Sequence, residues 1–170
     1  MNRPNENEYP VYYSNYINLV EDDDIISVLE NQIDFVKKFF INISEEKSNF
    51  RYAEGKWTIK EVFGHVIDTE RIFAYRALRI SRNDKTPLPG YDQDLFVKNS
   101  NFKNVSLQNL VDEFISVRKS NLKMFKNFSS EMWLNIGTAN EKLISVRAIA
   151  FILAGHLLHH LKVIEQKYLK

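Results

Sequence analysis

The stretch Ser145–Tyr168, SVRAIAFILAGHLLHHLKVIEQKY, decides the fold. Placed at 100° steps, its apolar residues fall on one arc, which predicts an amphipathic helix from Ser145 to about Tyr168. His156 and His160 lie inside this arc, one turn apart, whereas His159 lies about 140° from its centre and is expected to face outward. The residues expected to face the core are Val146, Ile149, Ala150, Leu153, Leu157, Leu161 and Ile164.

Three further stretches, at about residues 22–44, 58–82 and 106–128, show the same helical periodicity. Thr58 and Glu61 form an S/T-x-x-E capping box at the start of the second of them. Four amphipathic helices of about 20 to 25 residues predict an all-α four-helix bundle, with long connections between helices 1 and 2 and between helices 2 and 3. The segment Ser129–Asn140 is expected to be a connection with one short turn.

Length and composition restrict the class of protein. A chain of 170 residues fits a single domain over residues 1–170, in which the tyrosine-rich residues 1–20 are expected to form an arm packed on the bundle. The net charge of +1 argues against a dedicated nucleic-acid binder, and no apolar run has the length of a signal peptide or membrane span. We therefore expect a cytoplasmic protein with no nucleic-acid or membrane partner.

Several polar residues fall on the predicted apolar arcs and therefore need partners. Gln32 lies on the arc of the first helix, Glu70 on that of the second, and Arg118 and Asn121 on that of the third. Glu70 could act as a general base near a metal, but it lies about 140° around its helix from His65. The alternative, which we favour, is an ion pair between Glu70 and Arg118 in the core.

Histidines are the strongest candidates for chemistry. The chain has no cysteine, which excludes disulfides, thiolate metal sites and cysteine nucleophiles, so metal ligands must come from His, Asp and Glu. His156 and His160 are spaced to reach one ion, and His65 can complete a three-nitrogen site if its helix is a neighbour. Three protein ligands would leave open positions, as in a catalytic site. The competing interpretation is hydrogen-bonded core histidines without a metal.

Other residues are candidates for supporting roles. Asp68 and Glu61 lie near His65 in angle and could orient its ring or hold a water, or they could form a solvated helix face. Arg76 and Arg79 could attract an anionic substrate, or they could be a surface charge row. Trp57 and Tyr91 could line a substrate pocket, although loop aromatics often only pack.

At these residues the sequence resembles the DinB/YfiT-like superfamily of metal-binding four-helix bundles. The resemblance covers about residues 50–169. Its order and spacing are more specific than any single motif. The segments that carry it are Lys56–His65 (KWTIKEVFGH), Arg76–Ile80 (RALRI), Pro87–Asp92 (PLPGYD), Ser145–Ala148 (SVRA) and Ala154–His160 (AGHLLHH).

The resemblance implies a divalent metal, often nickel or zinc, held by one histidine on the second helix and an i, i+4 pair on the last. These positions correspond to His65, His156 and His160. Family members with an assigned activity are mostly transferases and isomerases that use a low-molecular-weight thiol such as bacillithiol, and others are described as metal-dependent hydrolases. Many are homodimers.

Two hypotheses about function follow. The first is a metal-dependent enzyme that acts on a small-molecule substrate, by thiol-dependent transfer of the bacillithiol S-transferase type or by hydrolysis. Its substrate-binding candidates are Arg76, Trp57 and Tyr91, and Asp68 and Glu61 are its candidate catalytic carboxylates. The alternative is a non-catalytic helical bundle that binds a metal or another ligand.

Overall fold

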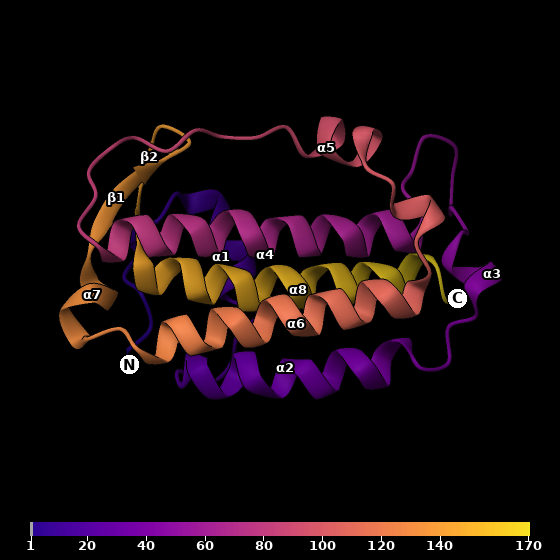
Figure 1. Cartoon of the computed structure of the whole chain (residues 1–170), viewed down its shortest axis with the longest axis horizontal. Coiled ribbons are helices and arrows are strands. Elements are labelled where there is room, and N and C mark those ends of the chain that lie inside the picture. Colours follow the sequence, from indigo (N-terminus) through magenta and orange to yellow (C-terminus); the bar gives the residue numbers. More distant parts are fainter. Residues whose placement is uncertain (1) are drawn as a thin grey trace.

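The computed structural model describes residues 2–170; Met1, which belongs to the predicted arm and domain, lies outside the described residues. Four long helices form a bundle, which confirms the predicted fold class (Figure 1). They are α2 (Ile25–Phe40), α4 (Ile59–Ser81), α6 (Leu107–Lys126) and α8 (Val146–Lys167). The short elements are η1 (Glu6–Glu8), η2 (Val11–Tyr13), α1 (Ser14–Ile17), α3 (Glu45–Ser48), α5 (Gln93–Asn99), η3 (Phe102–Asn104), α7 (Ser130–Leu134), β1 (Ile136–Ala139) and β2 (Lys142–Ser145).

The order of the long helices around the bundle explains the long connections. Helices α4 and α2 each pack against both α6 and α8, so α2 and α4 lie diagonally opposite. Figure 1 shows α4 and α6 running in one direction and α2 and α8 in the other. Because α4 and α6 are parallel neighbours, residues 82–106 must return along the length of the bundle, and α5 lies in this return.

Each long helix begins at a side-chain cap. Asp24, Thr58, Ser106 and Ser145 each accept a hydrogen bond from the backbone N–H three residues later, which satisfies a group that the helix leaves free. The first helix ends at Phe40 and not at Ser44 as expected, because Ser44 caps the separate turn α3 by accepting from Lys47 N.

A β-hairpin follows α7 where the sequence predicted only a connection with one short turn. Strands β1 and β2 pair antiparallel around Asn140 and Glu141, whose φ angles of 50° and 63° are those of a two-residue type I′ turn. Each strand has only four residues, and Glu replaces the glycine usual at the second turn position. The sequence signal was therefore too weak to predict the hairpin.

The hairpin also holds the return connection in place. Leu88 N donates to Thr138 O at 2.9 Å, and Asn140 N donates to Leu88 O at 2.9 Å. Gly90 lies so close to the turn that a Cβ there would be 2.2 Å from Asn140 Oδ1. The backbone from Leu88 to Tyr91 is thereby fixed above the second half of α4.

A buried polar layer joins all four long helices near mid-bundle. Arg118 donates to both carboxylate oxygens of Glu70, at 2.6 and 3.1 Å, and to Gln32 Oε1 at 2.7 Å. Gln32 Nε2 donates to Ala154 O at 2.9 Å, and Asn121 Nδ2 donates to Glu70 Oε2 at 3.0 Å. Both Glu70 and Arg118 are buried, so the predicted core ion pair is confirmed.

This polar layer divides the core into two apolar clusters. One cluster contains residues from the first half of α2 and α8 and the second half of α4 and α6, together with the hairpin and the arm. The other contains the opposite halves of the same helices. Buried phenylalanines belong to both clusters, Phe73 and Phe125 to the first and Phe63 and Phe114 to the second.

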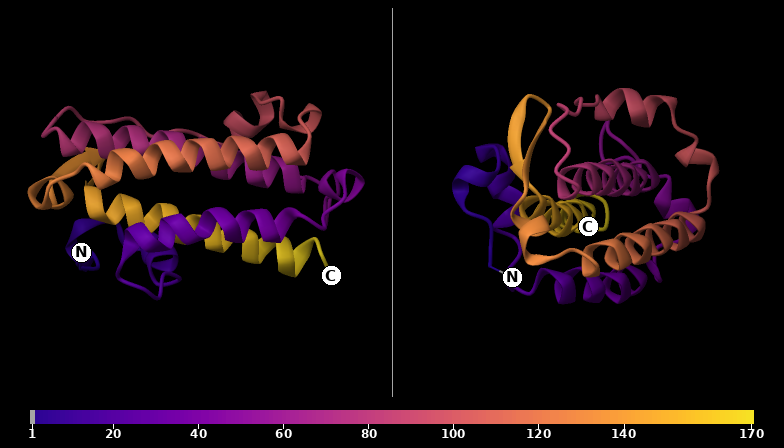
Figure 2. Two further views of the ribbon diagram at one scale, coloured as in Figure 1. Left: turned by 60° about the horizontal axis from the view of Figure 1, so that its bottom comes forward. Right: turned by 60° about the vertical axis from the view of Figure 1, so that its left-hand side comes forward.

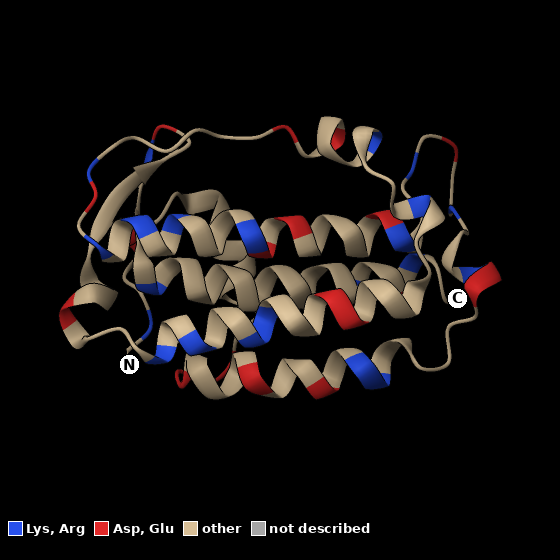
Figure 3. Cartoon of the chain, viewed as in Figure 1, with Lys and Arg blue, Asp and Glu red and all other residues tan. Residues whose placement is uncertain are grey.

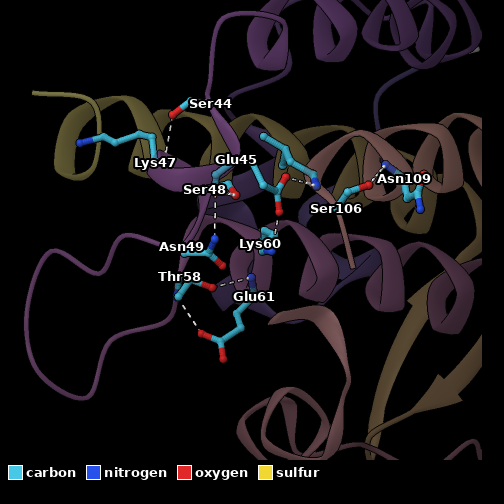
Figure 4. Close-up of polar contacts among 11 residues, drawn as sticks. Ser44, Glu45, Lys47, Ser48, Asn49, Thr58, Lys60, Glu61, Ser106 and Asn109 are labelled. Carbon is cyan, nitrogen blue, oxygen red and sulfur yellow. Dashed lines mark hydrogen bonds and ion pairs between the residues drawn. The ribbon is translucent and has the colours of Figure 1, made fainter. Parts of the chain in front are cut away.

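A second polar cluster closes the end of the bundle where α4 and α6 begin (Figure 4). Lys60, although buried, donates from Nζ to Glu45 Oε1 at 2.7 Å, and Glu45 Oε2 accepts from Leu107 N at 2.9 Å. The hydrogen bond from Lys60 and the backbone bond from Leu107 lower the pKa of Glu45. One carboxylate thus connects α3 to the first turns of α4 and α6.

The N-terminal arm packs along α8. Arg147 and Ser145, at the start of α8, donate to the carboxylate of Glu8. Burial raises the pKa of Glu8, but the hydrogen bonds from Arg147, Asn5 N and Ser145 outweigh it and bring the value down to about 2. Farther along, α1 approaches α8 so closely that a Cβ on Gly155 would lie 1.9 Å from the carbonyl oxygen of Tyr16.

Helix α8 is the central helix of the fold. Figure 2 shows it enclosed between the arm and the other long helices, and every residue from 148 to 157 is buried. By length and composition alone it could cross a membrane, but 67% of the relevant window is buried inside the protein, as in the core helix of a soluble bundle. Figure 3 shows both signs of charge spread over the other helices on the face in view.

The buried ion pair should be essential only as a pair. Replacing Glu70 with Leu leaves the Arg118 charge buried and unpaired, so we expect a loss of about 3–5 kcal/mol in the free energy of unfolding, measured by urea denaturation. The double variant Glu70→Leu/Arg118→Met should lose much less than the sum of the single variants. Removing Glu30, whose pair with Lys126 is half exposed, should cost less than about 1 kcal/mol. A comparable small loss for Glu70→Leu would contradict the proposed role.

Packing of the arm against α8 should require a glycine at position 155. Glycine to alanine within a helix is by itself stabilising by up to about 1 kcal/mol. We expect Gly155→Ala to be destabilising instead, because the new methyl group would displace Tyr16. Hydrogen exchange should show faster exchange in residues 6–18. A more stable variant with unchanged exchange there would show that the close contact is unimportant.

Candidate metal centre

Three histidines from two neighbouring helices converge at one point. His65 lies on α4, and His156 and His160 lie one turn apart on α8. His156 Nε2 is 3.1 Å from His65 Nε2 and 3.1 Å from His160 Nε2. Ligand atoms of all three residues lie within 4.8 Å of one another. The structure therefore brings together the three residues chosen as ligand candidates from the sequence.

Burial keeps these imidazoles neutral. It lowers the pKa of His65 to about 4. Burial, with smaller effects of His65 and His159, lowers the pKa of His160 to about 3, and burial also lowers the pKa of His156. At neutral pH the three rings therefore carry lone pairs and no charge, which is the form that binds metal.

The donor set fits a divalent ion. With metal–nitrogen bonds of about 2.0–2.1 Å, two neighbouring ligands of one ion lie about 3 Å apart, which agrees with the observed separations. A hydrogen bond without a metal accounts for these contacts less well, since His156 Nε2 makes both of them and a single ring nitrogen either donates or accepts, but does not do both. Within residues 2–170, no carboxylate or fourth histidine joins the cluster, so an ion held here would keep open positions.

Two separate cavities reach the histidines. The larger, of about 390 Å³, is lined by His65 and His156, and the smaller, of about 260 Å³, is lined by His160 and His159. The larger cavity is walled by aromatic residues of the arm, α4 and the return connection: Tyr12, Tyr13, Tyr16, Phe73 and Tyr91. The smaller is bordered by the segment before α4 and by the end of α8, including Tyr52, Trp57 and Tyr168.

Neither candidate carboxylate lies at the histidines. Glu61 accepts from Thr58 N at 2.8 Å and pairs with Arg51 at 3.2 Å, so it serves the start of α4. Asp68 lines neither cavity and is half-buried; burial raises its pKa against the opposing effect of Arg71. The spacing on the helix placed both residues near His65 in angle, but Glu61 is held at the start of α4 by its own partners and Asp68 does not join the histidine cluster.

The predicted substrate-binding residues lie around the two cavities. Arg76 and Tyr91 line the larger one, and Tyr91 hydrogen-bonds Thr69 at 2.8 Å between their hydroxyl oxygens. Trp57 lines the smaller one and packs against His65, with ring centres 5.2 Å apart. Arg79, in contrast, pairs with Asp84 on the surface and reaches neither cavity.

Sequence reasoning missed several residues of the larger cavity. Tyr16 packs edge-on against His156, with ring centres 5.3 Å apart, and Tyr13 packs edge-on against Phe73. Thr69 follows His65 by one helical turn, which places it on the same face of α4, but the sequence did not single it out as a site residue. The clustered tyrosines of residues 1–20 predicted an arm packed on the bundle, but their spacing did not indicate which helix the arm would cover. His159, expected to face outward, packs against Tyr16 and stays partly exposed.

The buried histidines should make the metal-free protein sensitive to acid. Their pKa values in the folded state lie below the ordinary value near 6.5, so their contribution is complete above that pH and is lost as the pH falls toward about 4. Each histidine adds a slope of up to about 1.4 kcal/mol per pH unit in that range. Urea unfolding of chelator-treated protein between pH 7.5 and 4.5 should show this slope, and it should be smaller in His160→Gln. A slope in His160→Gln equal to that of the wild type would contradict the lowered pKa of His160.

The comparisons with known proteins concern this same bundle. The sequence matches the profile of the DinB superfamily over residues 29–164. No curated protein sequence matches it. Among solved structures, the chain is similar to YfiT from Bacillus subtilis, described as a probable metal-dependent hydrolase with an unusual four-helix bundle topology. The TM-score is 0.76 at 15% identity, covering 96% of this chain and 89% of YfiT, and a likeness at this identity shows the fold alone. Because the matched profile spans most of the chain and all three clustered histidines, the chain belongs to the DinB superfamily.

Proposed function

We propose that the protein is a metal-dependent enzyme in which His65, His156 and His160 hold one divalent ion. The observation that carries the proposal is the convergence of three neutral imidazole nitrogens, two of them from buried residues, beside two cavities that reach them. Neutral imidazoles suit nickel, zinc, iron and copper, and the family resemblance favours nickel or zinc. Bound there, the ion supplies Lewis acidity and lowers the pKa of a coordinated water or thiol.

The surroundings of the histidines support catalysis over a purely structural site. A structural zinc site is closed by four protein ligands, whereas only three candidates cluster within the described chain. The cavity beside His65 and His156 has the volume of a small-molecule site, at about 390 Å³. A small-molecule substrate in this cavity would meet the metal directly, while Tyr16 and Trp57 shield the rings of His156 and His65.

Hydrolysis is the first candidate reaction. The structural relative YfiT is described as a probable metal-dependent hydrolase, and the protein would need only water as its second reactant. The described residues offer no carboxylate at the cluster to act as a general base. Activation of the water would therefore depend on the ion itself, with Tyr91 and Thr69 placed to orient the substrate.

Thiol-dependent transfer is the second candidate, and the two cavities favour it. A transfer reaction needs two organic reactants at one centre. The cavity at His65 and His156 and the cavity at His160 offer separate places for an electrophile and a low-molecular-weight thiol. Lys56, which borders the smaller cavity, could pair with a carboxylate of such a thiol.

Metal analysis is the direct test of the proposed site. We expect tag-free protein to carry about one divalent ion per chain and His160→Ala to lose it, because two remaining nitrogens bind weakly. His159→Ala is the matched control, since His159 neighbours the cluster without joining it, and it should keep the ion. Metal-loaded wild type would then be assayed with ester and amide substrates and with thiols plus electrophiles. Absence of metal after incubation with nickel or zinc would reject the proposal.

A further inference from the structure

Arg76 is a buried cation without a carboxylate partner. Only 4% of its surface is exposed, yet no Asp or Glu of residues 2–170 pairs with it. The other two deeply placed arginines differ, since Arg118 pairs with Glu70 and Arg147 pairs with Glu8. A buried charge is costly unless it is compensated, so an arginine left in this state suggests a partner outside the chain.

The free donors of Arg76 face the larger cavity. Its Nη2 donates to Pro89 O at 2.7 Å, and its guanidinium lies 5.0 Å from the ring centre of Phe73. No protein acceptor is present for Nε or Nη1, and none of the fully buried side-chain nitrogens in the described chain lacks a partner. These two groups therefore reach accessible space, and Arg76 lines the cavity.

The charge of the cavity selects an anion. Its lining contains one arginine and no Asp or Glu, and the remaining polar groups are neutral, including Thr69, Gln93 and Asn140. The positive charge of Arg76 is close enough to lower the pKa values of Tyr13 and Tyr91, although burial raises both overall. A single cation among neutral donors matches a singly charged carboxylate, which arginine can bind through two parallel hydrogen bonds.

The helix fixes how far this anion lies from the histidines. His65, Thr69, Phe73 and Arg76 lie along one face of α4, because eleven residues make nearly three whole turns. The backbone positions of His65 and Arg76 are about 16 Å apart, at 1.5 Å per residue. Side chains lean toward the start of the helix at both positions and arginine is the longer, so the guanidinium lies somewhat closer to the histidine cluster than this backbone distance.

We propose that the larger cavity takes an elongated organic carboxylate. Its acid group binds Arg76, its apolar middle lies against Phe73, Tyr13 and Tyr91, and its other end reaches the histidines. The placement of the other end at the histidines rests on the proposed function, whereas the binding of the acid group to Arg76 does not. The backbone hydrogen bonds of Leu88 with the hairpin and the close approach of Gly90 to Asn140 fix the position of Pro89. The carbonyl oxygen of Pro89 in turn holds the guanidinium of Arg76 in place.

Binding of octanoate to chelator-treated protein tests the acid end without a metal. By isothermal titration calorimetry, we expect octanoate to bind wild type at least about tenfold more tightly than the uncharged octanamide. Arg76→Gln should lose this preference. The control is Arg79→Gln, which removes an arginine on the same helix that reaches neither cavity. Because the comparison of acid and amide is made within wild type, it stays informative even if Arg76→Gln folds poorly. Equal binding of acid and amide to wild type would overturn the proposal.

Binding of diacids to nickel-loaded protein tests the distance between Arg76 and the metal ion. Suberate can bridge Arg76 and the ion, whereas succinate is too short, so suberate should bind more tightly in wild type and lose its advantage in Arg76→Gln. Equal affinity for the two diacids would overturn the two-ended arrangement while leaving the metal site intact. Failure to bind nickel, with octanoate binding retained, would overturn the proposed function and leave the acid end supported.

Discussion

The ion pair between Glu70 and Arg118 sets the rotation of the helices on which the site depends. Through Gln32 and Ala154 O it ties α2, α4, α6 and α8 to one another at a single level. Since a buried charge must keep its partner, neither α4 nor α6 can rotate without breaking it. His65 precedes Glu70 by five residues, so a Glu70 that points toward α6 leaves His65 directed toward α8.

The chemistry of the centre follows from where that rotation places the rings. Buried among apolar helix residues, the imidazoles lose their affinity for protons and keep their affinity for metal ions. In acid solution the same burial lowers the stability of the metal-free protein, because the buried rings resist the protons that the unfolded chain binds. A hydrophobic bundle around a polar layer thus accounts both for the packing of the long helices and for the neutral state of the one histidine cluster within the described chain.

Much of this arrangement could be predicted from the sequence because it depends on helical periodicity. The four helix starts, the inward Glu70 and Arg118, and the pairing of His156 with His160 all follow from positions on a helix of 3.6 residues per turn. The hairpin, the return connection and the placement of the arm could not be predicted in this way. They depend on contacts between residues far apart in the chain, such as Leu88 with Thr138 and Glu8 with Arg147. The position of Glu61 could be predicted in part, because the sequence already identified it as a member of the capping box with Thr58.

The N-terminal arm contributes to the larger cavity although the superfamily profile does not extend to it. Tyr12, Tyr13 and Tyr16 wall the larger cavity, yet they lie before residue 29, outside the region that matches the superfamily profile. The histidines lie inside it. A substitution at Tyr12, which is half exposed, can therefore reshape the cavity while leaving the histidines and the polar layer in place. Exposed positions of the arm thus offer a way to change the shape of the cavity one side chain at a time, while the buried contacts of the arm with α8 stay as they are.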